Sequence, residues 1–192
     1  MADINSQLVG RQRAPAEQRA GRPPAAPRAQ PSDPNLITFV ELLFFAYRDF
    51  TREADAVLAE YDLGRAHHRV LHFVNRHPGL RVADLLEILK ITKQSLARVL
   101  KELVDKGWIA QKAGERDRRQ RLLNATAKGA TLAGRLDALQ SKRVAQALEY
   151  AGSTDDGAIA RFLFAMISTE ERPPVQALLP APVELAASAD RD

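Results

Sequence analysis

Basic and polar side chains gather in two short stretches of the sequence, and these residues have the clearest chemical potential. Arg98 lies within the first stretch, residues 92–101, and Arg119 within the second, residues 116–121. A guanidinium group can donate two parallel hydrogen bonds to the edge of a guanine base, or clamp a phosphate. The other candidates in the two stretches are Thr92, Lys93, Gln94, Ser95, Ala97, Lys101, Arg116, Asp117, Arg118 and Arg121. The two stretches therefore favour contact with nucleic acid, and the alternative is an ordinary solvated surface.

The distribution of charge supports this interpretation better than the total does. The formal net charge of the 192-residue chain is +4, which is too small by itself to indicate a nucleic-acid-binding protein. Residues 80–129, however, hold twice as many Lys and Arg as Asp and Glu, whereas the flanking segments 32–79 and 130–169 together are slightly acidic. Such a concentration is expected when one part of a fold faces phosphates.

Catalytic and metal chemistry find no support in the residue pattern. The chain has no cysteine, which excludes disulfides and thiolate-bound zinc. His68 and His72 are four residues apart, but no Asp or Glu lies among the histidines and no HExxH pattern occurs, so we expect no metal site. A glycine-rich cofactor loop, a nucleophile motif and a paired set of carboxylates are also absent. We therefore expect neither an enzyme nor a cofactor.

The spacing of apolar residues predicts the helices that position the first basic stretch. Helices are expected over residues 34–60, 65–76 and 82–89, and over a further segment that Thr92 caps and Gly107 ends. In that last helix one face is apolar: Leu96, Val99, Leu100, Leu103 and Val104. The basic and polar residues then lie toward the opposite side. Two short helices, a three-residue turn and a basic outer face are typical of a helix-turn-helix.

A small β-hairpin is expected to carry the second basic stretch. Residues 108–112 and 119–123 can alternate as two short strands around the polar segment 113–118, which makes this hairpin a wing. Thr126 then caps a long helix over residues 126–151, and a final apolar helix is expected over residues 153–169. The predicted fold is mainly α with a small β-wing, within a domain of residues 32–169.

The two ends of the chain differ from this domain in composition. Residues 1–31 contain five arginines and no aromatic residue in a context rich in Pro and Ala, and we expect a disordered basic arm. Residues 170–192 are acidic and rich in proline, and we expect a disordered tail. The longest apolar cluster, residues 42–46, is far shorter than the roughly 20 residues that cross a bilayer. With no signal sequence at the N-terminus, a cytoplasmic protein is expected.

Several motifs in residues 63–129 resemble the MarR family of bacterial winged-helix transcription factors. They are the run Ile91–Leu100, its continuation Leu103–Ile109, and the wing signature Asp117-Arg118-Arg119 followed by Leu122-Leu123 and Thr126–Gly129. The flanking helices match the dimerisation elements of that family in position and length. Within the family, segments 44–48, 64–69 and 92–95 are similar to the PetP-type subgroup. A departure is Ala125, where the family usually has leucine.

The resemblance implies a homodimer that reads a pseudo-palindromic operator in double-stranded DNA. It also implies that Arg119 enters the minor groove while Asp117 orients the wing. The residues themselves favour dimerisation, because the first and last predicted helices are apolar on several faces, more than one such chain can cover. The alternative is a winged-helix module that contacts another protein and does not bind DNA, which the basic cluster disfavours.

A crevice for a small-molecule effector is the last expectation from the resemblance. In MarR-like proteins the helix expected over residues 65–76 lines such a crevice, and Tyr47, Arg48, His68 and His72 are the candidates here. The alternative is that these side chains belong to the packed core or to the dimer interface.

Overall fold

The computed structural model describes residues 34–114, 117–152 and 156–184. The expected basic arm, Arg116 and the last part of the expected tail lie outside these residues. The chain divides into two compact units, Met1–Phe39 and Val40–Asp192. Of the first unit, residues 34–39 are described, and they form the beginning of the first helix.

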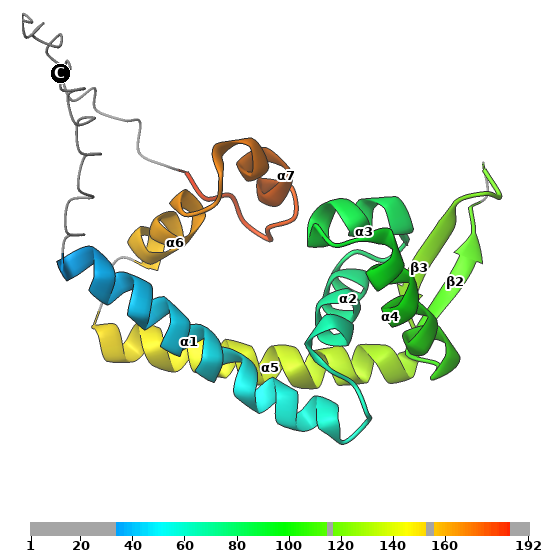
Figure 1. Ribbon diagram of the computed structural model, residues 1–192, viewed down its shortest axis with the longest axis horizontal. Helices are drawn as coiled ribbons and strands as arrows, with labels where there is room; N and C mark the ends of the chain where they lie inside the picture. The colour runs from blue at the N-terminus through cyan, green and yellow to red at the C-terminus, as the bar shows by residue number, and fades with distance from the viewer. Residues whose placement is uncertain (1–33, 115–116, 153–155, 185–192) are drawn as a thin grey trace, which may run out of the picture. The chain divides into compact units, whose positions relative to one another are not determined.

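The described residues are mostly helical, with one small antiparallel sheet, as the sequence predicted. The helices are α1 (Pro34–Ala59), α2 (Arg65–Arg76), α3 (Val82–Leu89), α4 (Lys93–Asp105), α5 (Ala127–Ala151), α6 (Asp156–Ala165) and α7 (Arg172–Gln176), with a 3-10 turn η1 (Thr169–Glu171) between the last two (Figure 1). The strands are β1 (Leu80–Arg81), β2 (Ile109–Ala113) and β3 (Arg121–Ala125). No helix in the described ranges is both long and apolar enough to cross a bilayer.

The sheet contains one strand that the sequence did not reveal. Its order is β1-β3-β2, and Leu80 pairs with Leu123 across the β1–β3 ladder. A strand of two residues has no periodicity of its own, so only the pairing defines it. The β2–β3 hairpin was predicted, but β3 begins two residues later than expected. Residues 117–120 instead form the turn, where the Gln120 amide donates to the Asp117 carbonyl at 3.0 Å.

A single apolar core holds the helix-turn-helix and the sheet together. Helix α2 packs against α5, α4 and β3 (Figure 1). Leu71, Leu85, Leu103 and Leu123, from four different elements, are all fully buried. Each such leucine stabilises the fold by about 1.5–3 kcal/mol relative to an exposed one. The position of α4 is therefore set by burial, which leaves its polar face free.

The start of α5 lies very close to Trp108, the residue just before β2. The Thr126 hydroxyl caps α5 by accepting from the Gly129 amide at 3.0 Å, as the sequence predicted. A Cβ on Gly129 would lie 2.1 Å from the Trp108 carbonyl oxygen, so only glycine fits this approach. Trp108 is buried, and the Lys128 ammonium lies 3.7 Å from the centre of its ring. These contacts join the wing to the long helix.

The expectation of a disordered tail from residue 170 is wrong for its first residues. The described chain forms η1 and α7 there, and the earlier helix α6 ends at Ala165, before the expected residue 169. Arg172 connects the two parts because its guanidinium donates to the carbonyls of Ile167 and Ala165, at 2.9 and 2.8 Å. Prolines are tolerated in the first turn of α7 because no amide there has a helical acceptor.

Candidate nucleic-acid interface

Helix α4 presents a polar face to solvent because its apolar face packs into the core. Leu96, Val99, Leu100 and Leu103 are buried, and Val104 is half-buried. The Thr92 hydroxyl caps the helix by accepting from the Ser95 amide at 3.1 Å, as its sequence position predicted. The candidate side chains on the other side are all exposed: Thr92, Lys93, Gln94, Ser95, Ala97, Arg98 and Lys101. The helix therefore offers a solvent-facing surface with three cationic groups.

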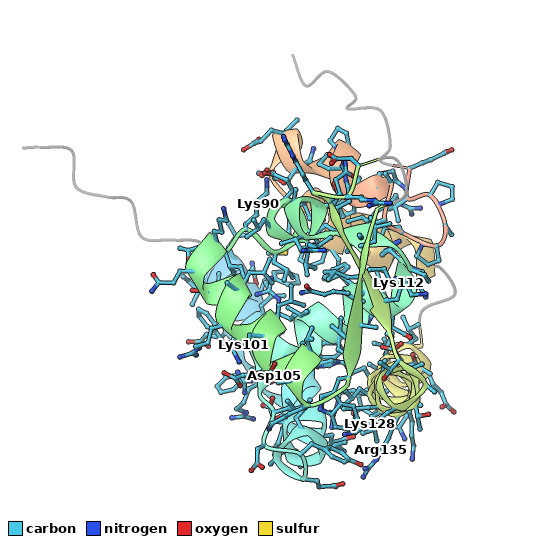
Figure 2. The ribbon with its side chains drawn as sticks, turned by 90° about the vertical axis from the view of Figure 1, so that its right-hand side faces the viewer. Lys90, Lys101, Asp105, Lys112, Lys128 and Arg135 are labelled. Carbon is cyan, nitrogen blue, oxygen red and sulfur yellow. The ribbon has the colours of Figure 1, made fainter. Side chains whose placement is uncertain are left out.

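The cations on this face differ in how freely they can meet a phosphate or a base. Arg98 forms no ion pair with any residue that the structure describes. Lys101, one turn further along, forms an ion pair with Asp105. The hydrogen bond from Lys101 to that carboxylate raises the pKa of the ammonium group above its ordinary value. Lys101 thus carries its own counter-charge, Asp105 (Figure 2), whereas Arg98 has none among the residues that the structure describes.

The turn before α4 is fixed by backbone geometry. Lys90 closes α3 in the left-handed conformation, with φ 49°, and its amide donates to the Leu86 carbonyl. Behind the turn, Arg69 on α2 donates to the Leu89 carbonyl at 3.4 Å. The three-residue connection predicted from the sequence is therefore present between α3 and α4.

A histidine–carboxylate pair that sequence reasoning missed connects α2 to α4. Nε2 of His67 lies 2.9 Å from the Glu102 carboxylate, and Nδ1 of the same ring accepts from the Gly64 amide at 3.1 Å. The accepting Nδ1 places the proton of neutral His67 on Nε2, where it can donate to Glu102. A separation of 35 residues gives no local signal, so only the fold could reveal this pair.

The wing carries its arginines on and next to a turn that Asp117 shapes. The Asp117 carboxylate accepts from the Arg119 amide at 2.9 Å, so Asp117 orders the tip of the hairpin. A Cβ on Gly114 would lie 2.8 Å from the Asp117 carbonyl oxygen, which explains the glycine at this bend. Arg118, Arg119 and Arg121 are all exposed. Figure 2 views the end of the molecule that bears α4 and the wing, with Lys101 on α4 and Lys112 on β2.

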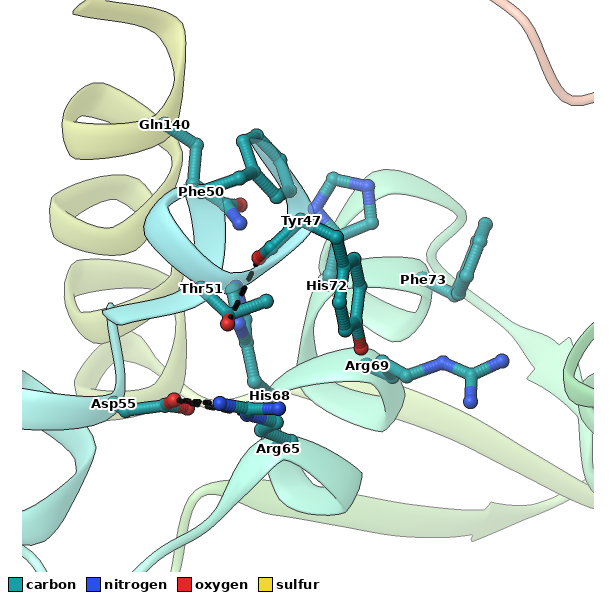
Figure 3. Close-up of a pocket in the computed structure, with 10 residues that line it drawn as sticks. All are labelled: Tyr47, Phe50, Thr51, Asp55, Arg65, His68, Arg69, His72, Phe73 and Gln140. Carbon is teal, nitrogen blue, oxygen red and sulfur yellow. Dashed lines mark hydrogen bonds and ion pairs between the residues drawn. The ribbon is translucent and has the colours of Figure 1, made fainter. Parts of the chain in front are cut away.

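A cavity of about 480 Å³ lies between α1, α2 and α5 (Figure 3). Its lining consists of Tyr47, Phe50, Thr51, Asp55, Arg65, His68, Arg69, His72, Phe73 and Gln140. Three of the four residues that the sequence proposed for an effector crevice are therefore brought together here. Arg48 is not among the lining residues; its guanidinium pairs with Asp49 and lies 5.1 Å from the centre of the Phe45 ring.

Several polar side chains of this cavity already have partners, either in the lining or just outside it. Arg65 forms an ion pair with Asp55 at 2.7 Å, and Nδ1 of His72 lies 2.9 Å from the Asp137 carboxylate. Burial lowers the pKa of His68 below its ordinary value, and the neighbouring His72 lowers it further. A neutral imidazole in a partly apolar cavity suits an uncharged hydrogen-bonding partner.

The arrangement defines a class of protein. A helix-turn-helix formed by α3 and α4, followed directly by the β2–β3 hairpin, is a winged helix-turn-helix.

Comparison with known proteins then gives the family. The sequence pattern of the MarR family matches residues 61–120. The chain is 43% identical over 141 residues to the HTH-type transcriptional regulator PetP of Rhodobacter capsulatus, covering 73% of this chain and 85% of that protein. The chain therefore belongs to the MarR family of transcriptional regulators, which are not enzymes.

Solved structures show the same fold at lower sequence identity. A mutant of MarR from E. coli, complexed with operator DNA, superposes with a TM-score of 0.53 and 23% identity, covering 68% of this chain and 94% of that one. The transcriptional regulator SlyA superposes with a TM-score of 0.60 and 19% identity, covering 71% and 98% of the two chains. The mainly helical fold with a small β-wing, expected from the sequence, is thus confirmed.

Proposed function

We propose that this protein regulates transcription as a homodimer that binds a pseudo-palindromic operator in double-stranded DNA. The observation that carries the proposal is the exposed polar face of α4, which faces away from the core beside an arginine-bearing wing. An α-helix fits the major groove of B-DNA, where an arginine can recognise guanine. Arg98 is the proposed base-reading residue, and Lys93, Gln94 and Ser95 approach bases and backbone from the first turn of α4.

The wing supplies a second, different contact. We assign Arg119 to the minor groove, where a narrow A·T-rich segment concentrates negative potential. Arg116, Arg118 and Arg121 are assigned to phosphates, which position the protein and carry no sequence information. Asp117 contributes indirectly because its carboxylate orders the tip that presents Arg119.

Dimerisation is supported by apolar surface that a single chain leaves uncovered. Phe44 on α1 is 70% exposed and Leu163 on α6 is 53% exposed. Further large apolar side chains are exposed on the same helices and on α5: Val40, Leu42, Phe45, Tyr47, Val144, Tyr150 and Phe162. So much exposed apolar surface marks an interaction site. A two-fold dimer would cover it and would also place two α4 helices for a two-fold operator.

The cavity between α1, α2 and α5 is proposed as the effector crevice. Its volume falls within the range of small-molecule sites, and Tyr47, His68 and His72 give it both apolar and hydrogen-bonding groups. Arg48 is proposed only as a rim contact, since it does not line the cavity.

Selection from a random pool of DNA duplexes tests the proposed function. The full chain should enrich a two-fold-symmetric sequence, and gel-shift assays should show that it binds this sequence more tightly than a scrambled one. Enrichment of no sequence, together with binding that ignores sequence, would leave the protein-interaction module as the better hypothesis.

The oligomeric state is tested by analytical ultracentrifugation. The native protein should sediment with twice the 21.2 kDa mass of the chain. Phe44→Glu should yield monomers because it places a charge in the proposed interface, whereas Gln111→Glu, an equally new carboxylate on the wing, should stay dimeric. A native protein that is monomeric at micromolar concentration would contradict the dimer.

A further inference from the structure

Helix α4 carries two carboxylates, Glu102 and Asp105, close to the proposed base-reading residue Arg98. Asp105 is already paired with Lys101. Glu102 lies four residues after Arg98, a spacing at which an arginine and a glutamate are neighbours on a helix and can form an ion pair. Such a pair would offset the Arg98 charge and turn its guanidinium away from a guanine edge. Yet Arg98 forms no ion pair with any residue that the structure describes.

Glu102 is held instead by a histidine on another helix. Nε2 of His67 on α2 lies 2.9 Å from the Glu102 carboxylate, and the Gly64 amide donates to Nδ1 of the same ring at 3.1 Å. These two contacts fix the ring from both sides. Only 14% of the His67 side chain is exposed, whereas 43% of the Glu102 side chain is exposed. The carboxylate is therefore accessible enough to turn to Arg98 when the histidine is removed.

The lysine on the other side of Glu102 is engaged by the backbone. Lys106 lies four residues after Glu102, a spacing that also favours an ion pair. Its ammonium group instead donates to the carbonyls of Tyr61 and Asp62, at 3.0 Å in both cases. His67 is therefore the group that decides whether the Glu102 carboxylate faces α2 or its neighbour on α4.

We propose that His67 is a positioning residue for DNA recognition, which holds the Glu102 carboxylate against α2 and so keeps Arg98 available to a base. The inference rests on the proposed operator binding and adds a residue that does not itself touch DNA. Because Nδ1 accepts from the Gly64 amide, the proton of the neutral ring lies on Nε2, and the ring holds the carboxylate without a charge of its own. Loss of the ring nitrogens should free Glu102 to pair with Arg98, and loss of the carboxylate as well should release Arg98 again.

A double-mutant cycle measured by fluorescence anisotropy tests this role. His67→Phe keeps a ring at the half-buried position but provides no donor to Glu102. An exposed ion pair at this spacing shifts an equilibrium by about twofold, so the variant should weaken binding of a dimer to the operator about fourfold. The loss on scrambled DNA should be smaller, so the operator preference should fall. In the Glu102→Gln background the same replacement of His67 should cost nothing, because no carboxylate is left to capture Arg98.

A purely structural role of His67 gives a different result. If the histidine only braced α4, its replacement would weaken binding equally with and without the Glu102 carboxylate, and that result would overturn the proposal. Native operator affinity in His67→Phe would overturn it as well. His77→Ala is the matched control, because it removes a histidine from the C-terminal end of α2, where the ring stacks on Phe73, and it should keep the operator preference.

Two further measurements complete the test. His67→Ala repeats the cycle without any ring, so that the result does not depend on how a phenylalanine packs, and circular dichroism compares the fold of each variant with that of the native protein. A native protein without operator preference would refute the proposed function, and this inference with it. A native preference that survives both replacements of His67 would refute the role of His67 alone.

Discussion

Replacing Arg98 by alanine tests the proposed division of labour on α4 most directly. Arg98 is exposed and unpaired among the described residues, so its loss leaves the core and the caps of α4 unchanged. A bidentate contact with guanine discriminates against the wrong base by about 1–3 kcal/mol. A dimer on a two-fold operator makes the contact twice, so Arg98→Ala should cost about 2–6 kcal/mol if the two half-sites are independent.

Lys101→Ala provides the matched comparison on the same face. Because Asp105 already offsets the Lys101 charge, this variant should lose little DNA-binding affinity, and the loss should be equal on operator and scrambled DNA. Fluorescence anisotropy on both duplexes over a salt series measures the affinity and the operator preference of each variant. Each phosphate contact that is lost reduces the slope of log K against log salt by about 0.9. If Arg98→Ala weakened binding to both duplexes equally and kept the operator preference, base recognition by Arg98 would be refuted.

Four further outcomes follow from the structure. Arg119→Ala should weaken binding most on operators with A·T-rich flanks, and anisotropy that shows the same loss on G·C-rich flanks would argue against minor-groove insertion. Leu103→Ala should lower the free energy of unfolding by about 2–5 kcal/mol in urea titrations, because the side chain is fully buried; a loss under 1 kcal/mol would be inconsistent with that burial. Gly129→Ala should also destabilise the fold, by about 1–3 kcal/mol, since the new Cβ would overlap the Trp108 carbonyl, and an unchanged urea midpoint would contradict the close approach. Because the folded-state pKa of His68 is lowered, its contribution to the free energy of unfolding should be complete above about pH 6.5 and decline as the pH falls below that value. His68→Gln should flatten this pH dependence in urea titrations, and identical curves of unfolding free energy against pH for the variant and the native protein would contradict the lowered pKa.

Local sequence signals determined most of the helical architecture. The apolar spacing and capping residues predicted α2 and α3 with the bounds that the structure has, and they placed Thr92 and Thr126 as caps. These signals succeed because a helix and its caps depend on residues three or four apart. The same spacing separated the buried face of α4 from its polar face, so the candidate DNA-binding residues could be named without a structure.

Contacts between distant residues were decided only by the tertiary structure. Strand β1 exists because Leu80 meets Leu123, and the His67–Glu102 pair exists because α2 packs on α4. The composition of residues 170–192 predicted disorder, yet Glu171 pairs with Lys90 and residues 171–180 form one wall of a cavity. Composition measures whether a segment can form a core of its own, and it carries no information on whether the segment packs against a core that already exists. For the same reason the sequence named Tyr47, His68 and His72 for one crevice but gave no sign of a second cavity behind α3.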